Sequence, residues 1–205
     1  MRFLLTASLI MVANSSAIAA PAEIISAANA SFQHLAEVVV VDQIDGRCGA
    51  DDSVNPFAAY CTTDDTIFIS KEAMNKPVAD YLLAHVFGHV VQVEHGVADV
   101  ALDAIWAEPS REKELRGYVA RQVDCIAGVL VMRSGRSKMD LRKLLSADPF
   151  EDAHWGRNPL RAGPLMGIGL AARAKWFDIG QRGDLSQCAA GDFSSDLLLR
   201  ADQWP

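Results

Sequence analysis

From residue 77 onward, apolar residues recur at helical spacing between proline and glycine breaks. Pro77 and Gly96 bound the first helix that this pattern predicts, and Pro109 stops the second. Ser110 is expected to cap the third and longest helix. The predicted helices cover residues 77–96, 97–108, 110–135, 140–147, 165–179 and 192–204.

The first part of the chain predicts one helix and two strands. An Ala-rich apolar stretch after Pro21 favours a helix. Four consecutive valines at residues 38–41 predict a strand over residues 37–44, and the apolar run at residues 66–70 predicts a second strand. A polar, glycine-containing loop follows the first strand. The pattern therefore predicts an α+β fold that is mainly helical, with a small antiparallel sheet.

Residues 1–19 have the pattern of a secretory signal peptide. Arg2 supplies a positive start, residues 3–12 form a short apolar run, and Ala17-Ile18-Ala19 is a small-x-small cleavage site. The apolar run is too short to span a bilayer as an uncleaved anchor. We therefore expect a mature single domain at residues 20–205, periplasmic or secreted, with no membrane span after cleavage.

The acidic charge balance narrows the class of partners. The chain has 19 basic and 26 acidic side chains and a formal net charge of −7. Losing Arg2 with the signal peptide leaves 18 against 26, a charge of −8. An acidic chain without a basic run argues against nucleic acid and anionic lipid as partners. Four cysteines in an exported protein predict two disulfides, and none has the C-x-x-C spacing of a cysteine zinc site.

Residues 81–92 carry the candidate chemistry. His85 and His89 are four residues apart, so a helix places both imidazoles on one face, one turn apart, as two ligands of one metal ion require. In a zinc peptidase helix of this kind, the residue after the first histidine is a glutamate that takes a proton from the metal-bound water. In this chain that residue is Val86.

The histidine helix and several other segments occur in a fixed order along the chain. Residues 84–92, AHVFGHVVQ, resemble the active-site helix A-H-E-x-G-H-H-V-Q of the neutral zinc metallopeptidases, and residues 122–129, QVDCIAGV, resemble their second motif, E-L-Q-A-D-C-x-A-G-V. The resemblance extends over residues 45–193 and implies a zincin-like metallopeptidase domain. The other matching segments are Cys48-Gly49, Pro56-Phe57, Tyr60-Cys61, residues 65–69, Arg173, Trp176-Phe177, Gly180, Gly183-Asp184 and Cys188.

Position by position, the resemblance is incomplete. His85 and His89 match the two histidine ligands of the family, and Asp124 matches an aspartate that orients a ligand histidine from behind. Val86 replaces the catalytic glutamate, and Ala120 replaces the glutamate expected as the third ligand. The resemblance therefore implies a degenerate site that holds zinc weakly, through His85, His89 and Asp124, and it implies no other cofactor.

The four cysteines are expected to pair in two disulfides. Cys48–Cys61 would close the loop between the predicted strands, and Cys125–Cys188 would tie the long helix to the C-terminal segment. The chain-entropy model gives about 3 kcal/mol of stabilisation for the first bond and about 4 kcal/mol for the second.

Three interpretations of the histidine helix stay open. The protein is an exported, catalytically inactive relative of zinc peptidases that binds a peptide or a partner protein. Alternatively, it is an active metallopeptidase that uses His85, His89 and Asp124 with a recruited base. In the third interpretation, these three side chains form a hydrogen-bonded core network without metal. Glu94 faces the wrong side of the helix, and the other candidate bases are Glu108, Glu112 and Glu114.

Overall fold

The computed structural model describes residues 20–49, 57–145 and 167–205, so the expected signal peptide lies outside the described residues. The described part is mainly helical, with one small sheet, which confirms the predicted α+β class. Its α-helices are α1 (Ala20–Ser31), α2 (Lys71–Met74), α3 (Ala79–Glu94), α4 (Val97–Ala107), α5 (Glu112–Arg133), α6 (Leu141–Leu144), α7 (Leu170–Gly180) and α8 (Asp196–Ala201). Its strands are β1 (Glu37–Val41), β2 (Ala58–Cys61) and β3 (Thr66–Ser70), and its 3₁₀ turns are η1 (Arg47–Gly49), η2 (Pro109–Arg111) and η3 (Leu185–Cys188).

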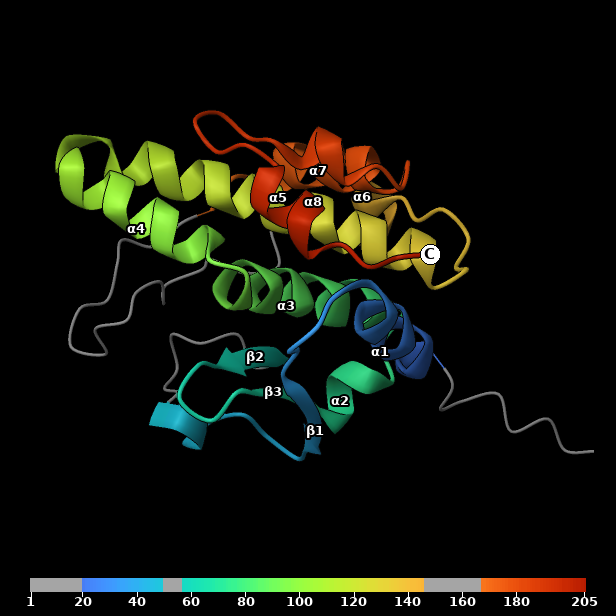
Figure 1. Cartoon of the computed structure of the whole chain (residues 1–205). Coiled ribbons are helices and arrows are strands. Elements are labelled where there is room, and N and C mark those ends of the chain that lie inside the picture. Colours follow the sequence, from blue (N-terminus) through green and yellow to red (C-terminus); the bar gives the residue numbers. More distant parts are fainter. Residues whose placement is uncertain (1–19, 50–56, 146–166) are drawn as a thin grey trace, which may run out of the picture.

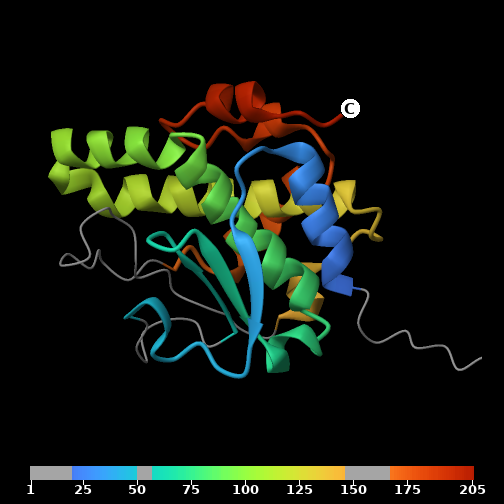
Figure 2. The same ribbon diagram turned by 60° about the horizontal axis from the view of Figure 1, so that its bottom comes forward.

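Helix α3 lies between the sheet and the other long helices (Figure 1). The strands and α2 are on one side of α3, while α5 and α7 are on the other, and α1 packs on both α3 and α5. Figure 2 shows the same order after rotation, and it shows α4 and the first part of α5 as a hairpin that projects from the body. The expected packing of the histidine helix against the 122–130 segment is confirmed, because α3 and α5 are in extensive contact.

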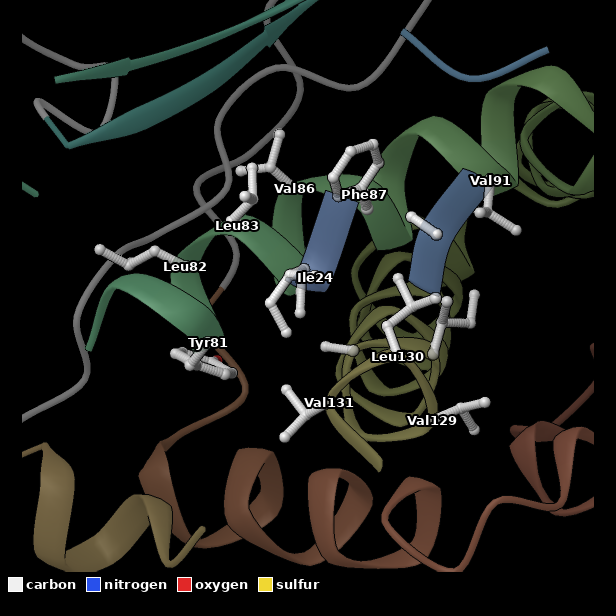
Figure 3. Close-up of a cluster of buried hydrophobic side chains, with 14 of the residues drawn as sticks. Ile24, Tyr81, Leu82, Leu83, Val86, Phe87, Val91, Val129, Leu130 and Val131 are labelled. Carbon is white, nitrogen blue, oxygen red and sulfur yellow. The ribbon is translucent and has the colours of Figure 1, made fainter. Parts of the chain in front are cut away.

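Helix α3 is the centre of the core because it is apolar on almost every side. Twelve of its 16 residues are buried. Figure 3 shows Val86 and Phe87 on the side of the strands, whereas Tyr81 points toward α7. The Tyr81 and Phe177 rings meet edge to face with their centroids 5.4 Å apart, which links α3 directly to α7.

The three-stranded sheet is mixed, with the order β1-β3-β2. The two strands predicted from sequence, β1 and β3, are parallel, with Val38 opposite Ile67, so the antiparallel prediction for that pair is wrong. The strand missed from sequence, β2, pairs antiparallel with β3. The chain passes through β2 before it forms β3, and this extra reversal makes the first and last strands run in the same direction. Only the β2–β3 hairpin fits the expected antiparallel sheet.

Several predicted helix ends differ from the structure. Ser110 does not cap the long helix, because it lies within η2, and α5 begins at Glu112 without a side-chain cap. In the range 192–204 only α8 is helical, because a turn with Gly191 at φ 55° and a bridge between Ala190 and Phe193 precede it. The helix predicted for residues 165–179 corresponds to α7, which begins at Leu170.

Both predicted disulfides are confirmed. Cys48 bonds Cys61 across a sequence separation of 13, and Cys125 bonds Cys188 across 63 residues. The second bond joins α5 to η3 and so anchors the C-terminal segment on the longest helix. No helix in the described ranges is both long and apolar enough to cross a membrane.

Helices α5 and α7 cross in close contact at two glycines. A Cβ atom on Gly128 would overlap the backbone oxygen of Phe177, and one on Gly180 would overlap the backbone oxygen of Cys125. Neither obstacle is a flexible side chain, so the helices would have to separate to admit even a methyl group.

Gly180→Ala should therefore destabilise the protein. Alanine is the better helix former, but overpacking against a helix backbone should lower the free energy of unfolding by about 1–3 kcal/mol. Gly128→Ala, on the facing helix, should have the same effect. Urea denaturation measures both, and a wild-type or higher midpoint for either variant would contradict the close crossing.

His95, just after α3, is a partly buried histidine outside the candidate site. Its ring lies 5.7 Å from the Phe32 ring, and its Nε2 atom is buried without a hydrogen-bond partner in the described part of the chain. Burial lowers the pKa of His95 from 6.5, and the nearby Glu94 carboxylate opposes this effect less strongly.

The lowered pKa of His95 predicts acid sensitivity. The unfolded chain takes up a proton at a higher pH than the folded chain does, so stability is lost as the pH falls through the unfolded value of 6.5. Denaturation midpoints measured between pH 8 and pH 5 should fall less steeply for His95→Gln than for the wild type. Identical pH slopes would show that His95 is not held neutral by the fold.

Candidate functional site

One face of α3 carries the polar side chains of the site. Tyr81, His85 and His89 follow one another at intervals of four residues, so they form a stripe along the helix. Gly88 on the same side allows α5 to approach closely, since a Cβ there would lie 2.9 Å from the backbone oxygen of Val123. Tyr81 and His85 are buried, and His89 is partly buried.

Asp124 of α5 is the centre of the site. It is fully buried, and its Oδ1 atom accepts hydrogen bonds from the Tyr81 hydroxyl and the His85 Nδ1 atom, each at 2.9 Å. Its Oδ2 atom accepts a hydrogen bond from Nη1 of Arg173 in α7 at 3.2 Å. The expected contact between Asp124 and a histidine of α3 is confirmed. Three helices therefore meet at one carboxylate.

The charge of Asp124 is balanced inside the protein. Arg173 is also fully buried, so a cation and an anion face each other without access to water. Burial, followed by the negative charge of Asp124, raises the pKa of Tyr81 well above 10, so Tyr81 is a neutral hydrogen-bond donor at physiological pH. A buried charge needs such compensation, because an isolated carboxylate in an apolar interior is strongly unfavourable.

The contact with Asp124 sets the orientation of the His85 ring. When the Nδ1–H group of neutral His85 donates a hydrogen bond to the carboxylate, the Nε2 atom carries a lone pair. That nitrogen faces the Nε2 atom of His89 at 3.3 Å. A proton on His89 Nε2 makes this contact a hydrogen bond. Two nitrogen ligands at about 2.0–2.1 Å from a tetrahedral zinc ion would also lie about 3.3 Å apart, so the spacing fits two of the ligands of such an ion.

A third ligand is missing from the described residues. Ala120 is buried one helical turn before Asp124, and its methyl group has no ligand atom. Asp124 binds the far nitrogen of the His85 ring, so the three expected ligands His85, His89 and Asp124 do not converge on one point. In the described ranges, the one group of three closely spaced ligand side chains is Cys48, Cys61 and Asp64, and its cysteines are used in a disulfide.

The structure also places Val86 and the candidate bases. Val86 is 6% exposed, belongs to the main hydrophobic core and points toward the strands (Figure 3). Glu112 lies twelve residues before Asp124 in α5, about 18 Å along the helix axis. Each candidate carboxylate already has a partner: Glu94 accepts from Tyr60, Glu108 and Glu114 pair with Arg111, and Glu112 pairs with Arg116.

Sequence reasoning missed the roles of Tyr81 and Arg173. Tyr81 precedes His85 by four residues, and this spacing could have assigned it to the same helix face. Arg173 belongs to a segment that resembles the metallopeptidase family, but no local pattern shows that its guanidinium reaches a carboxylate 49 residues earlier in the chain.

Comparison with known proteins adds no relative. No protein-family model, no curated protein and no solved structure matches the chain. The interpretation of the site therefore depends on its own geometry.

The buried ion pair predicts strong coupling between α5 and α7. Arg173→Met leaves the Asp124 charge without its cation and should lower the free energy of unfolding by about 3–5 kcal/mol. Asp124→Asn in the same protein should recover part of that loss, because the uncompensated charge is gone. Urea denaturation of both single variants and the double variant tests the coupling.

Arg200→Met is the matched control, because Arg200 is an exposed arginine on α8. It should change stability by no more than about 0.5 kcal/mol. Additive losses at Asp124 and Arg173 would show that the two side chains do not stabilise the fold as a pair.

Proposed function

We propose that this protein is a catalytically inactive relative of zincin-like zinc metallopeptidases. The observation that carries the proposal is the His85–His89 pair held by Asp124, together with apolar residues at the two positions that hydrolysis needs most. Hydrolytic zinc requires three protein ligands, an open water position and a proton acceptor. Val86 can accept no proton, and Ala120 can bind no metal.

The protein is proposed to act outside the cytoplasm, in the periplasm or after secretion. Two disulfides support an oxidising compartment, and the signal-peptide pattern of residues 1–19 agrees with export. A peptide or a partner protein is its proposed ligand. The acidic charge of the chain disfavours nucleic acid in this role.

A metal-free core network is compatible with this proposal. The two oxygens of Asp124 accept hydrogen bonds from three side chains, so the network satisfies this carboxylate without any ion. In this form the site stabilises the packing of three helices, and zinc binds weakly between the two histidines.

The second candidate function is an active metallopeptidase with a recruited base. The separation of the His85 and His89 nitrogens favours it, because 3.3 Å suits two ligands of one zinc ion. It requires one glutamate to leave its partner, and Glu94 is the nearest in sequence. Glu94 is bonded to Tyr60 on the far side of α3, so this candidate is the weaker one.

Four forms of the protein separate these functions: wild type, Val86→Glu, Ala120→Glu and the double variant. Ala120→Glu alone should raise zinc affinity by roughly tenfold or more, because it adds a third ligand, but without a base it should add little hydrolysis. Val86→Glu alone should change neither the zinc affinity nor the hydrolysis rate by much, because the third ligand is still missing. A base contributes roughly 10²–10⁴ in rate, so only the double variant should hydrolyse an unstructured protein such as casein. Zinc titration and casein cleavage with and without chelator measure the two effects.

The matched control is Val86→Gln combined with Ala120→Glu, which has the same size and polarity at position 86 but no base. It should bind zinc like the double variant and remain inactive. Because Val86 is in the core, thermal unfolding of every variant verifies that it folds. Chelator-sensitive cleavage by the wild type at the rate of the double variant would refute the inactive relative and establish the recruited base.

A further inference from the structure

A surface cleft between α6 and α7 contains no residue of the histidine site. Its volume is about 540 Å³, within the range of small-molecule sites. Helix α7 separates the two regions, because its Arg173 and Phe177 are buried in the core while its Lys175 and Asp178 line the cleft. The remaining lining residues are Asp140, Arg142, Ala174, Ile179, Arg182 and Gln187.

The charge of this region is opposite to that of the whole chain. The cleft and the side chains paired with it include five basic and three acidic residues, a local charge of +2 in a chain of −7. Such a local excess of positive charge attracts anions. The basic residues are Lys138, Arg142, Lys143, Lys175 and Arg182, and the acidic ones are Asp140, Asp178 and Asp184.

The three carboxylates are already used by the local fold. Asp140 accepts the backbone N–H of Arg142 in the first turn of α6, at 3.0 Å, and Asp184 accepts that of Ser186 in the first turn of η3, at 2.9 Å. Asp178 accepts a hydrogen bond from the side-chain amide of Gln181 at 3.2 Å. The ion pairs of Asp178 with Lys138, at 3.5 Å, and of Asp140 with Lys143, at 3.8 Å, are long and exposed, so they neutralise little of the positive charge.

The cations that line the cleft have few partners. The side chains of Arg142 and Lys175 form no hydrogen bond or ion pair within the described part of the chain. The Nη1 atom of Arg182 lies 3.4 Å from Gln187 Oε1, a weak contact with a neutral group. Lys175 lies on α7 and Arg182 lies just after the end of that helix, and Arg142 of α6 lines the same cleft.

We propose that this cleft binds a small anionic molecule that carries at least two carboxylate or phosphate groups. Arg142 provides a planar fork that can bind either group through two hydrogen bonds, and Lys175 and Arg182 provide charges for a second group. Ala174 and Ile179 provide the apolar part of the lining, which can contact the carbon atoms between the charged groups. The site is separate from zinc binding and hydrolysis, so it stands or falls independently of the proposed function.

Titration with citrate and with pyrophosphate, at constant ionic strength against sodium chloride, tests the site on the full mature chain. Backbone amide resonances of α6 and of residues 174–187 should shift and saturate with a dissociation constant of about 1 mM or tighter. Citrate represents a carboxylate ligand and pyrophosphate a phosphate ligand, so the stronger of the two identifies the group.

Arg142→Gln and Lys175→Gln should each weaken binding by roughly tenfold, the loss expected for one charge-assisted contact. Arg200→Gln and Lys113→Gln are the matched controls, since both residues are exposed cations on other helices, and binding should be unchanged. The proposal is overturned if neither anion gives saturable shifts beyond those of chloride. It is also overturned if the control variants lose as much affinity as the cleft variants do.

Discussion

A carboxylate without access to water is the constraint around which this domain is arranged. The negative charge of Asp124 must be compensated inside the protein. Its partners come from two other helices: Tyr81 and His85 from α3, and Arg173 from α7. Each hydrogen bond has a direction and a length, so together they determine how α3, α5 and α7 sit relative to one another. Apolar packing alone would tolerate small shifts between these helices.

This arrangement also depends on positions where side chains are absent. Glycines at the α3–α5 and α5–α7 crossings let the backbones approach closely enough for the polar contacts to form. The disulfide between Cys125 and Cys188 ties the same part of α5 to the segment after α7. Close crossings, a covalent bond and a buried ion pair therefore support one junction, and the polar residues there have a structural role whether or not a metal ion binds.

The two histidines can be understood from the same junction. Asp124 holds His85 so that its Nε2 atom faces His89, and this orientation suits both a hydrogen bond and a pair of zinc ligands. Val86 and Ala120 lie on the same two helices as these polar residues. Both are apolar and buried, so neither side chain can accept a proton or bind a metal ion. On the outer side of α7, by contrast, Lys175 and Asp178 line the cleft together with Arg142 of α6 and Arg182 after the helix.

Local signals in the sequence determined much of this protein. The spacing of apolar residues and the positions of Pro77 and Gly96 predicted the histidine helix. The even cysteine count predicted two disulfides. The resemblance to metallopeptidases predicted that Asp124 contacts a histidine of α3. Tertiary structure decided what depends on distant partners. The parallel pairing of β1 and β3 follows from where β2 inserts, and strand pairing is a non-local hydrogen-bond choice. The sequence likewise did not predict that Tyr81 and Arg173 both contact Asp124, because a buried charge can take its partner from any element that packs nearby.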